Sequence, residues 1–186
     1  ADGPRGPVAP AGRGGYDYWL AANAPELVSD AYDCRVYDHE QREIRLHGHR
    51  IDALTDAAIR YITGRAHEKN PYFLFLSFLE PHHQNHRDDY PAPLGYAERY
   101  TSRWSPPDLT ALTGNAPQSL GGYYGMVKRL DEAFGRLVDI LHSTGQLDDT
   151  IIVFTSDHGS HFRTRNGQDK CSPHDASIRV PLAFHG

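Results

Sequence analysis

The sequence lacks several features that would assign it to a class at once. No apolar run approaches the roughly 20 residues of a membrane-spanning helix, because the longest run, Tyr72 to Leu79, has only the length of a strand. The net charge is −5 with both signs scattered, so the basic footprint of a nucleic-acid-binding protein is absent. There is no internal repeat, and no G-x-G-x-x-G motif follows a strand, which argues against a nucleotide-binding α/β domain.

Cysteine is also scarce. The two cysteines, Cys34 and Cys171, stand in unrelated contexts, so no disulfide framework is expected and a reducing compartment such as the cytoplasm is favoured.

The composition of the 186 residues is that of a globular protein, with 39% hydrophobic and 23% charged residues, and the length predicts one domain. Residues 1–15 are rich in Gly, Pro and Ala and indicate a loop or flexible end, which leaves residues 16–186 for the domain. Histidine is frequent, with 12 residues, and such enrichment favours metal binding or acid–base chemistry.

The order of hydrophobic patterns predicts an α/β fold. Residues 50–68 have the apolar period of an amphipathic helix, and 72–79 form a continuous apolar run typical of a strand buried on both faces. A long polar loop, 80–118, leads to a second helical pattern at 122–143 and a second strand at 150–155. Strand, helix and strand in this order predict a mainly parallel sheet flanked by helices, with ligands beyond the carboxyl ends of the strands.

Both predicted strands run into residues with suggestive chemistry. Glu80-Pro81-His82-His83 follows the first strand, and Asp157-His158-Gly159 follows the second, so two neighbouring strands would deliver these groups to one rim. A carboxylate suits hard cations, and an imidazole suits Mn²⁺ or Zn²⁺ better. Local sequence alone also allows Asp157 to be a helix cap, and His82 and His83 to be solvated loop residues.

Three polar features near these strands allow two interpretations each. Lys170 could neutralise charge on a metal-bound anion, or could be a solvated surface lysine. Cys171 has no demonstrable low-pKa environment apart from the adjacent lysine, so we do not interpret it as a nucleophile. Asp88 and Asp89 lie in the proline-rich loop with nothing to fix them, which favours solvated carboxylates over an acid–base pair.

Six stretches, in order and spacing, resemble the sulfatase family of the alkaline phosphatase superfamily. They are GGYDYWLA (14–21), GHRIDALTDAAIRYI (48–62), PYFLFLSFLEPHHQN (71–85), YYGMVKRLDEAFGRLVDIL (123–141), DDTIIVFTSDHG (148–159) and KCSPHDASIRVPL (170–182). The resemblance implies an alkaline phosphatase-like α/β sandwich and the activity of a sulfuric ester hydrolase.

The resemblance also implies roles for individual residues. Asp157 and His158 match the second pair of metal ligands, generally on Ca²⁺, although the imidazole leaves Mn²⁺, Mg²⁺ and Zn²⁺ open. His82 matches the histidine that contacts the sulfate and the leaving oxygen. Lys170 matches the lysine that binds the sulfate from the other side.

Three family motifs have no counterpart in this sequence. They are the first metal pair of two consecutive acids, the C-x-P-S-R motif whose cysteine becomes the formylglycine nucleophile, and the lysine–histidine pair downstream of it. These departures predict an interior part of a catalytic domain that turns over nothing on its own. The alternatives are a phosphodiesterase or phosphonate monoester hydrolase of the same superfamily, and a non-catalytic metal-binding module.

The substrate expected from the resemblance is a small-molecule or carbohydrate sulfate ester. His83, His161 and Arg163 could line a polar pocket for it, although basic polar loops are usually only solvated. We expect neither a nucleic-acid partner nor a membrane span, and the sequence indicates no oligomeric state.

Overall fold

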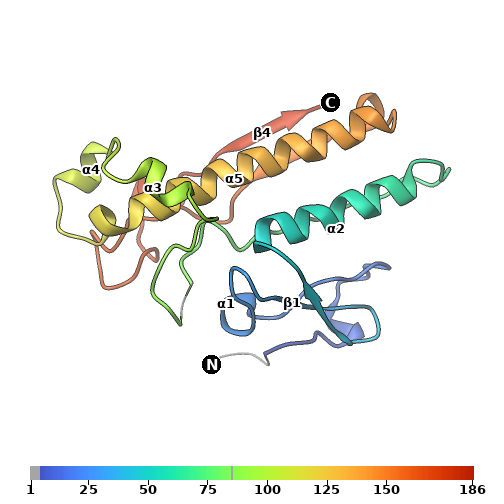
Figure 1. Ribbon diagram of the computed structural model, residues 1–186, viewed down its shortest axis with the longest axis horizontal. Helices are drawn as coiled ribbons and strands as arrows, with labels where there is room; N and C mark the ends of the chain where they lie inside the picture. The colour runs from blue at the N-terminus through green and yellow to red at the C-terminus, as the bar shows by residue number, and fades with distance from the viewer. Residues whose placement is uncertain (1–4, 85) are drawn as a thin grey trace.

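The computed structural model describes residues 5–84 and 86–186 (Figure 1). Its helices and strands, in chain order, are η1 (Pro10–Gly12), α1 (Pro25–Val28), β1 (Cys34–Tyr37), β2 (Glu43–Leu46), α2 (Arg50–Arg65), α3 (Tyr96–Tyr100), α4 (Pro107–Thr110), α5 (Ala116–Ser143), η2 (Leu147–Asp149), β3 (Ile152–Thr155), α6 (Asp175–Ile178) and β4 (Leu182–His185). None of the described helices is long and apolar enough to cross a membrane.

The two long helices, α2 and α5, lie side by side and form the centre of the molecule (Figure 1). Charge pairs join them: Arg129 Nε donates to Asp52 at 2.8 Å, and Arg136 pairs with Asp56. Both helices were predicted, but α5 begins at Ala116 rather than at Gly122. Its start carries Pro117, which the first turn of a helix accepts because the N–H there has no helical partner.

Glycines on α5 allow another segment of the chain to pack directly against the helix. A Cβ at Gly122 would lie 2.2 Å from the carbonyl oxygen of Tyr90, and one at Gly125 would lie 2.8 Å from the Cβ of Ala92. The segment around residues 90–101 therefore rests directly on the helix backbone. Glycine costs helix stability, and here close packing compensates for that cost.

The predicted loop 80–118 is partly folded. It contains α3 and α4, and it contributes to the largest hydrophobic cluster. The buried members of that cluster are Ile51, Tyr90, Leu109, Ala116, Leu120, Met126, Ala133 and Phe162. The prediction of a long irregular loop was wrong for this part, since short helices with few apolar residues give no clear period.

The strands form two small antiparallel sheets. Strand β1 pairs with β2, from Cys34 opposite Leu46, and β3 pairs with β4, with Val153 opposite Phe184. Sequence patterns indicated only β3 among these four.

The apolar run 72–79 belongs to no strand within the described residues. Phe73 and Phe75 are 73% and 68% exposed, so the expected burial on both faces is wrong in this chain. A central strand needs a hydrogen-bonded neighbour on each side, and the described residues supply none for this segment.

The described part of the amino-terminal segment is a largely irregular loop that contacts the rest of the protein. Residues 1–4 of the predicted 1–15 end lie outside the described residues. In the remainder, Gly6 forms a bridge with Asn23. Arg13 is 4% exposed and donates to the carbonyl oxygens of Val8 and His39 at 3.0 and 2.7 Å. This loop is therefore tied to the body through a buried guanidinium.

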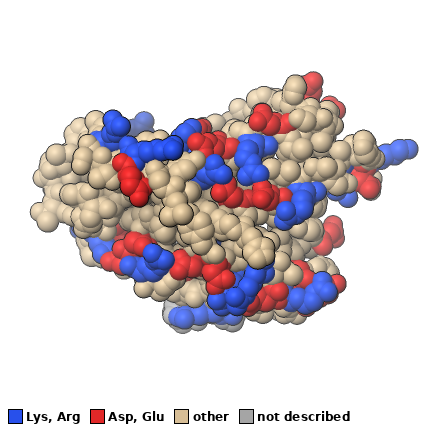
Figure 2. Space-filling view, viewed as in Figure 1, with Lys and Arg blue, Asp and Glu red and all other residues tan. Residues whose placement is uncertain are grey.

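Acidic and basic side chains alternate over the face shown in Figure 2, and neither sign forms a continuous patch there. The scattered signs of the sequence are thus also scattered on this surface.

Candidate functional site

The structure brings three of the four principal predicted site residues into contact. The Nζ atom of Lys170 lies 2.7 Å from Nε2 of His158 and 3.2 Å from Nε2 of His82. The two imidazole rings meet edge to face with centroids 6.0 Å apart. The loop after residue 79 and the loop after β3 therefore deliver their side chains to one point, as the ends of two predicted strands indicated.

Backbone carbonyls set the protonation pattern of both histidines. His82 Nδ1 lies 2.7 Å from the carbonyl oxygen of His83, and His158 Nδ1 lies 2.7 Å from that of Gly159. A carbonyl can only accept, so each Nδ1 carries a proton and each Nε2 presents a lone pair to Lys170. The lysine ammonium donates to both rings.

The surroundings of His82 disfavour its charged form. Burial is the largest cause that lowers the pKa of His82 below its usual value, and the positive charge of Lys170 acts in the same direction. The hydrogen bond to the His83 carbonyl opposes them. His82 is consequently a neutral imidazole at neutral pH in this arrangement.

Asp157 and His158 are placed so that both could reach one cation. Oδ2 of Asp157 lies 3.8 Å from Nε2 of His158, and the Asp157 side chain is 87% exposed. Two ligands of one ion, each at about 2.0–2.6 Å, have such a separation. This donor pair fits a divalent metal, provided that Lys170 moves off the His158 nitrogen. Within residues 5–84 and 86–186, no group of three acidic, histidine or cysteine side chains surrounds a common point.

Gly159 allows the loop after β3 to turn toward the site. Its N–H donates to the carbonyl oxygen of Ser177 at 2.8 Å, and a Cβ there would lie 2.2 Å from the carbonyl oxygen of Ala176. Helix α6 therefore packs against the backbone of the Asp-His-Gly stretch, where only glycine fits.

The three residues suggested as substrate contacts are each paired with other parts of the protein. His161 is fully buried, and its Nε2 lies 3.1 Å from the carbonyl oxygen of Lys170. Arg163 binds the carboxylates of Asp88 and Asp169. His83 stacks on His82, with ring centroids 4.6 Å apart, and faces Asp169.

Asp169 is the residue that sequence analysis missed. It is 7% exposed, and it accepts hydrogen bonds from Tyr90 and Asn115 in addition to Arg163. Its position next to Lys170 was the only signal in the sequence. Asp88, interpreted there as solvated, is in fact paired with Arg163, which holds the pKa of its carboxyl below the usual value.

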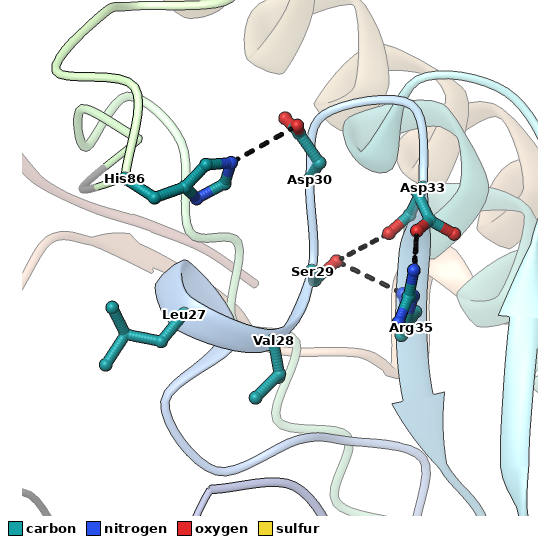
Figure 3. Close-up of a pocket in the computed structure, with 7 residues that line it drawn as sticks. All are labelled: Leu27, Val28, Ser29, Asp30, Asp33, Arg35 and His86. Carbon is teal, nitrogen blue, oxygen red and sulfur yellow. Dashed lines mark hydrogen bonds and ion pairs between the residues drawn. The ribbon is translucent and has the colours of Figure 1, made fainter.

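A separate cavity of about 290 Å³ lies beside α1 and β1 (Figure 3). Its lining is formed by residues 27–30 with Asp33, Arg35 and His86. The charged groups pair with one another: Arg35 Nε donates to Asp33 at 2.7 Å, and His86 lies 3.4 Å from Asp30. None of the predicted site residues lines this cavity.

Comparison with known proteins relates the chain to one family. The family model described as Sulfatase matches residues 4–185. The ulvan-active sulfatase of Formosa agariphila is 29% identical over 181 residues, which cover 91% of this chain and 33% of that protein. The chain thus spans about a third of the length of this relative.

Two solved structures show the fold. The yidJ sulfatase of Bacteroides fragilis superposes with a TM-score of 0.82 and 23% identity, over 97% of this chain and 40% of that one. BT4656, solved with its substrate D-glucosamine-2-N,6-O-disulfate, superposes with a TM-score of 0.57 and 23% identity, over 91% of this chain and 49% of that one. These likenesses confirm the predicted α/β, alkaline phosphatase-like fold, of which the chain is a partial domain. The chain belongs to the sulfatase family, whose members generally use a divalent metal ion.

Proposed function

We propose that the chain forms one side of the active site of a metal-dependent sulfuric ester hydrolase. The observation that carries the proposal is the meeting of His82, His158 and Lys170, which come from two loops far apart in the sequence. Family membership supports the reaction class. The nucleophile would be a formylglycine outside these 186 residues, because the sequence contains no C-x-P-S-R motif.

Lys170 and His82 are the groups proposed to bind the sulfate. The Lys170 ammonium and the His82 imidazole lie side by side at 3.2 Å, so an anion that replaced this contact could accept a hydrogen bond from the ammonium and, once Nε2 is protonated, a second one from the imidazole. A fixed ammonium in a half-buried position also stabilises negative charge that builds up on the sulfuryl oxygens in the transition state.

His82 is proposed to protonate the departing alcohol oxygen. In the structure Nε2 of His82 carries no proton, because burial and Lys170 lower the pKa of the ring. A sulfate ester bound beside the ring would draw Lys170 toward itself and favour the charged imidazole, because an adjacent anion raises the pKa of a histidine. Substrate binding would in this way prepare the acid.

Asp157 and His158 are the residues proposed to hold the divalent metal, with Ca²⁺ as the first candidate and Mn²⁺, Mg²⁺ or Zn²⁺ as alternatives. When bound, the ion would act as a Lewis acid and would neutralise charge at the sulfate. The Asp157 carboxylate suits Ca²⁺, while the imidazole of His158 favours the softer ions, so titration with each metal is required.

A carbohydrate or small-molecule sulfate ester is the proposed substrate class. Support comes from BT4656, whose substrate is a sulfated glucosamine, and from the ulvan-active sulfatase.

The test is steady-state hydrolysis of sulfate esters by the full-length protein that contains this chain. We expect His82→Asn to lower kcat by about 10²- to 10⁴-fold on an alkyl sulfate, the usual contribution of a general acid. Lys170→Met should also lower kcat/KM, whereas Lys128→Met, at an exposed lysine paired with Asp131, should not.

Metal removal and the isolated chain complete this test. A chelator should abolish activity, and the ion that restores it identifies the cofactor. The isolated 186-residue chain should bind metal weakly and hydrolyse no sulfate ester. Hydrolysis of phosphate diesters but not sulfate esters by the full-length protein would replace the proposal with the phosphodiesterase alternative.

A further inference from the structure

Asp169 is a buried carboxylate on which side chains from separate parts of the chain converge. Its Oδ1 accepts from the hydroxyl of Tyr90 at 3.2 Å and from Nδ2 of Asn115 at 3.3 Å. Its Oδ2 accepts from Nε of Arg163 at 3.2 Å and faces Nδ1 of His83 at 3.7 Å. A carboxylate has about four lone-pair positions, so these three hydrogen bonds occupy most of it, and His83 faces the remainder.

His83 connects this carboxylate to His82. Its Nδ1 is at ion-pair distance from Asp169, beyond the length of a hydrogen bond. Its ring stacks on the ring of His82 at a 16° angle, and its carbonyl oxygen accepts the proton on His82 Nδ1. The plane and the tautomer of His82 therefore both depend on where His83 lies.

The backbone of Asp169 acts on Lys170, the next residue. The Asp169 carbonyl oxygen accepts from the N–H of His161 at 2.8 Å, and the Lys170 carbonyl oxygen lies 3.1 Å from Nε2 of the same histidine. His161, whose side chain is fully buried, thus holds both carbonyl groups, that of Asp169 through its backbone N–H and that of Lys170 through its ring.

We propose that Asp169 is a positioning residue that orients His82, through His83, and Lys170, through the shared backbone, for cleavage of the sulfate ester. The inference rests on the proposed function, because that function assigns His82 as the acid for the leaving oxygen. His83 then belongs to the positioning unit and not to the substrate pocket. The competing explanation is that Asp169 only stabilises the fold.

The leaving group of the substrate distinguishes these explanations. Protonation by an acid matters greatly for a poor leaving group such as an alkyl or sugar alcohol, and little for 4-nitrophenolate. Asp169→Asn keeps the shape of the side chain but removes its charge. In the full-length protein it should lower kcat on an alkyl sulfate on the order of 10-fold, with at most about a 2-fold loss on 4-nitrophenyl sulfate. An equal loss on both substrates overturns the proposal.

Matched variants sharpen the comparison. Glu132→Gln is the control. The Glu132 carboxylate, on α5, also accepts hydrogen bonds from a tyrosine, Tyr96 on α3, and from an arginine, Arg129 on α5. It should change neither rate.

His83→Phe keeps the stacked ring and loses Nδ1, so it should reproduce the leaving-group dependence of Asp169→Asn. The double variant should be no worse than either single variant. Additive losses would contradict action through His83. Should Asp169→Asn fail to fold, His83→Phe provides the same test.

A measurement without activity separates this inference from the proposed function. The imidazole Cε1–H signal of His82, assigned by its loss in His82→Gln, should shift in Asp169→Asn and stay in place in Glu132→Gln. If the wild-type protein hydrolyses no sulfate ester, the proposed function fails, and the NMR shift still decides whether Asp169 positions His82. An unchanged His82 signal in Asp169→Asn overturns the inference.

Discussion

The two cysteines differ in their exposure to solvent, and we expect them to differ in reactivity. Cys34 is 1% exposed on β1, whereas Cys171 is exposed beside the site. Burial, the largest cause, raises the pKa of the Cys34 thiol to about 11, because the thiolate would lose its hydration. The raised pKa means that any stability contributed by this thiol is fully present at neutral pH and is lost progressively as the pH rises from the usual thiol pKa of 9.0 through about 11.

We therefore predict that one thiol per chain reacts quickly with a disulfide reagent at pH 8, and that this thiol is Cys171. Cys34 should react only after unfolding in urea. The measurement is the time course of thiol release by absorbance, with Cys171→Ser as the control that should remove the fast phase. A persistent fast phase in Cys171→Ser would show that Cys34 is accessible.

The order of residues predicted which side chains meet, but not which side chains surround them. The Pro-His and Asp-His-Gly stretches follow apolar runs, so their placement at one rim could be inferred before any coordinates, and Lys170 meets His82 and His158 there. Asp169 could not be inferred, because a buried carboxylate is defined by donors such as Tyr90, distant in sequence, that no local pattern connects to it.

Between the elements, a buried ion pair holds the turn that carries the histidines. Arg50, at the start of α2, donates through Nε to Glu80 at 2.9 Å and through Nη2 to Gln84 at 3.2 Å. The Arg50 and Glu80 side chains are 3% and 0% exposed. The two ends of the segment 80–84, with His82 between them, are thereby fixed to one guanidinium.

Arg50→Ala should lower the free energy of unfolding by about 3–5 kcal/mol, because it leaves the Glu80 carboxylate buried without a partner. The exposed pair of Arg42 with Asp38 offers the control, and Arg42→Ala should cost less than about 1 kcal/mol. Urea denaturation of the purified protein measures both. A similar decrease in the free energy of unfolding for the two variants would show that the buried pair stabilises the protein no more than the exposed pair does.

Helices were easier to predict than strands for a physical reason. The apolar period of α2 and of most of α5 is a local property, whereas β1, β2 and β4 each have four residues, too few to establish an alternation. The start of α5, from Ala116 to Gly121, was missed because the Gly121-Gly122 pair signals a break unless another segment packs against it, and at Gly122 that segment is the distant loop at Tyr90.

For the whole molecule, the sheet of β3 and β4 leaves apolar side chains open to solvent. Val153 and Phe184 face each other across the two strands and are 53% and 69% exposed. Ile151 and Leu182 add 76% and 62% exposure in the same two-stranded region. Paired, exposed apolar residues on a sheet favour association.

The isolated 186-residue chain should accordingly self-associate at micromolar concentration. Replacing Val153 and Phe184 by threonine should shift it toward the monomer, as sedimentation velocity can measure. Leu94→Thr is the control, because Leu94 is 87% exposed but lies alone in a loop. If the control shifts the equilibrium as much as the double variant, the sheet face is not the contact.

The close approach of the loop at Tyr90 to the glycines of α5 limits how this protein can vary over evolution. Tyr90 donates to Asp169, and its carbonyl oxygen would lie 2.2 Å from any side chain placed at Gly122. A new methyl group on the helix would have to push the tyrosine, and with it the carboxylate beside Lys170. Gly122 contacts none of His82, Lys170, Asp157 and His158. We nevertheless expect most substitutions at Gly122 to be excluded in sequences that keep these four residues.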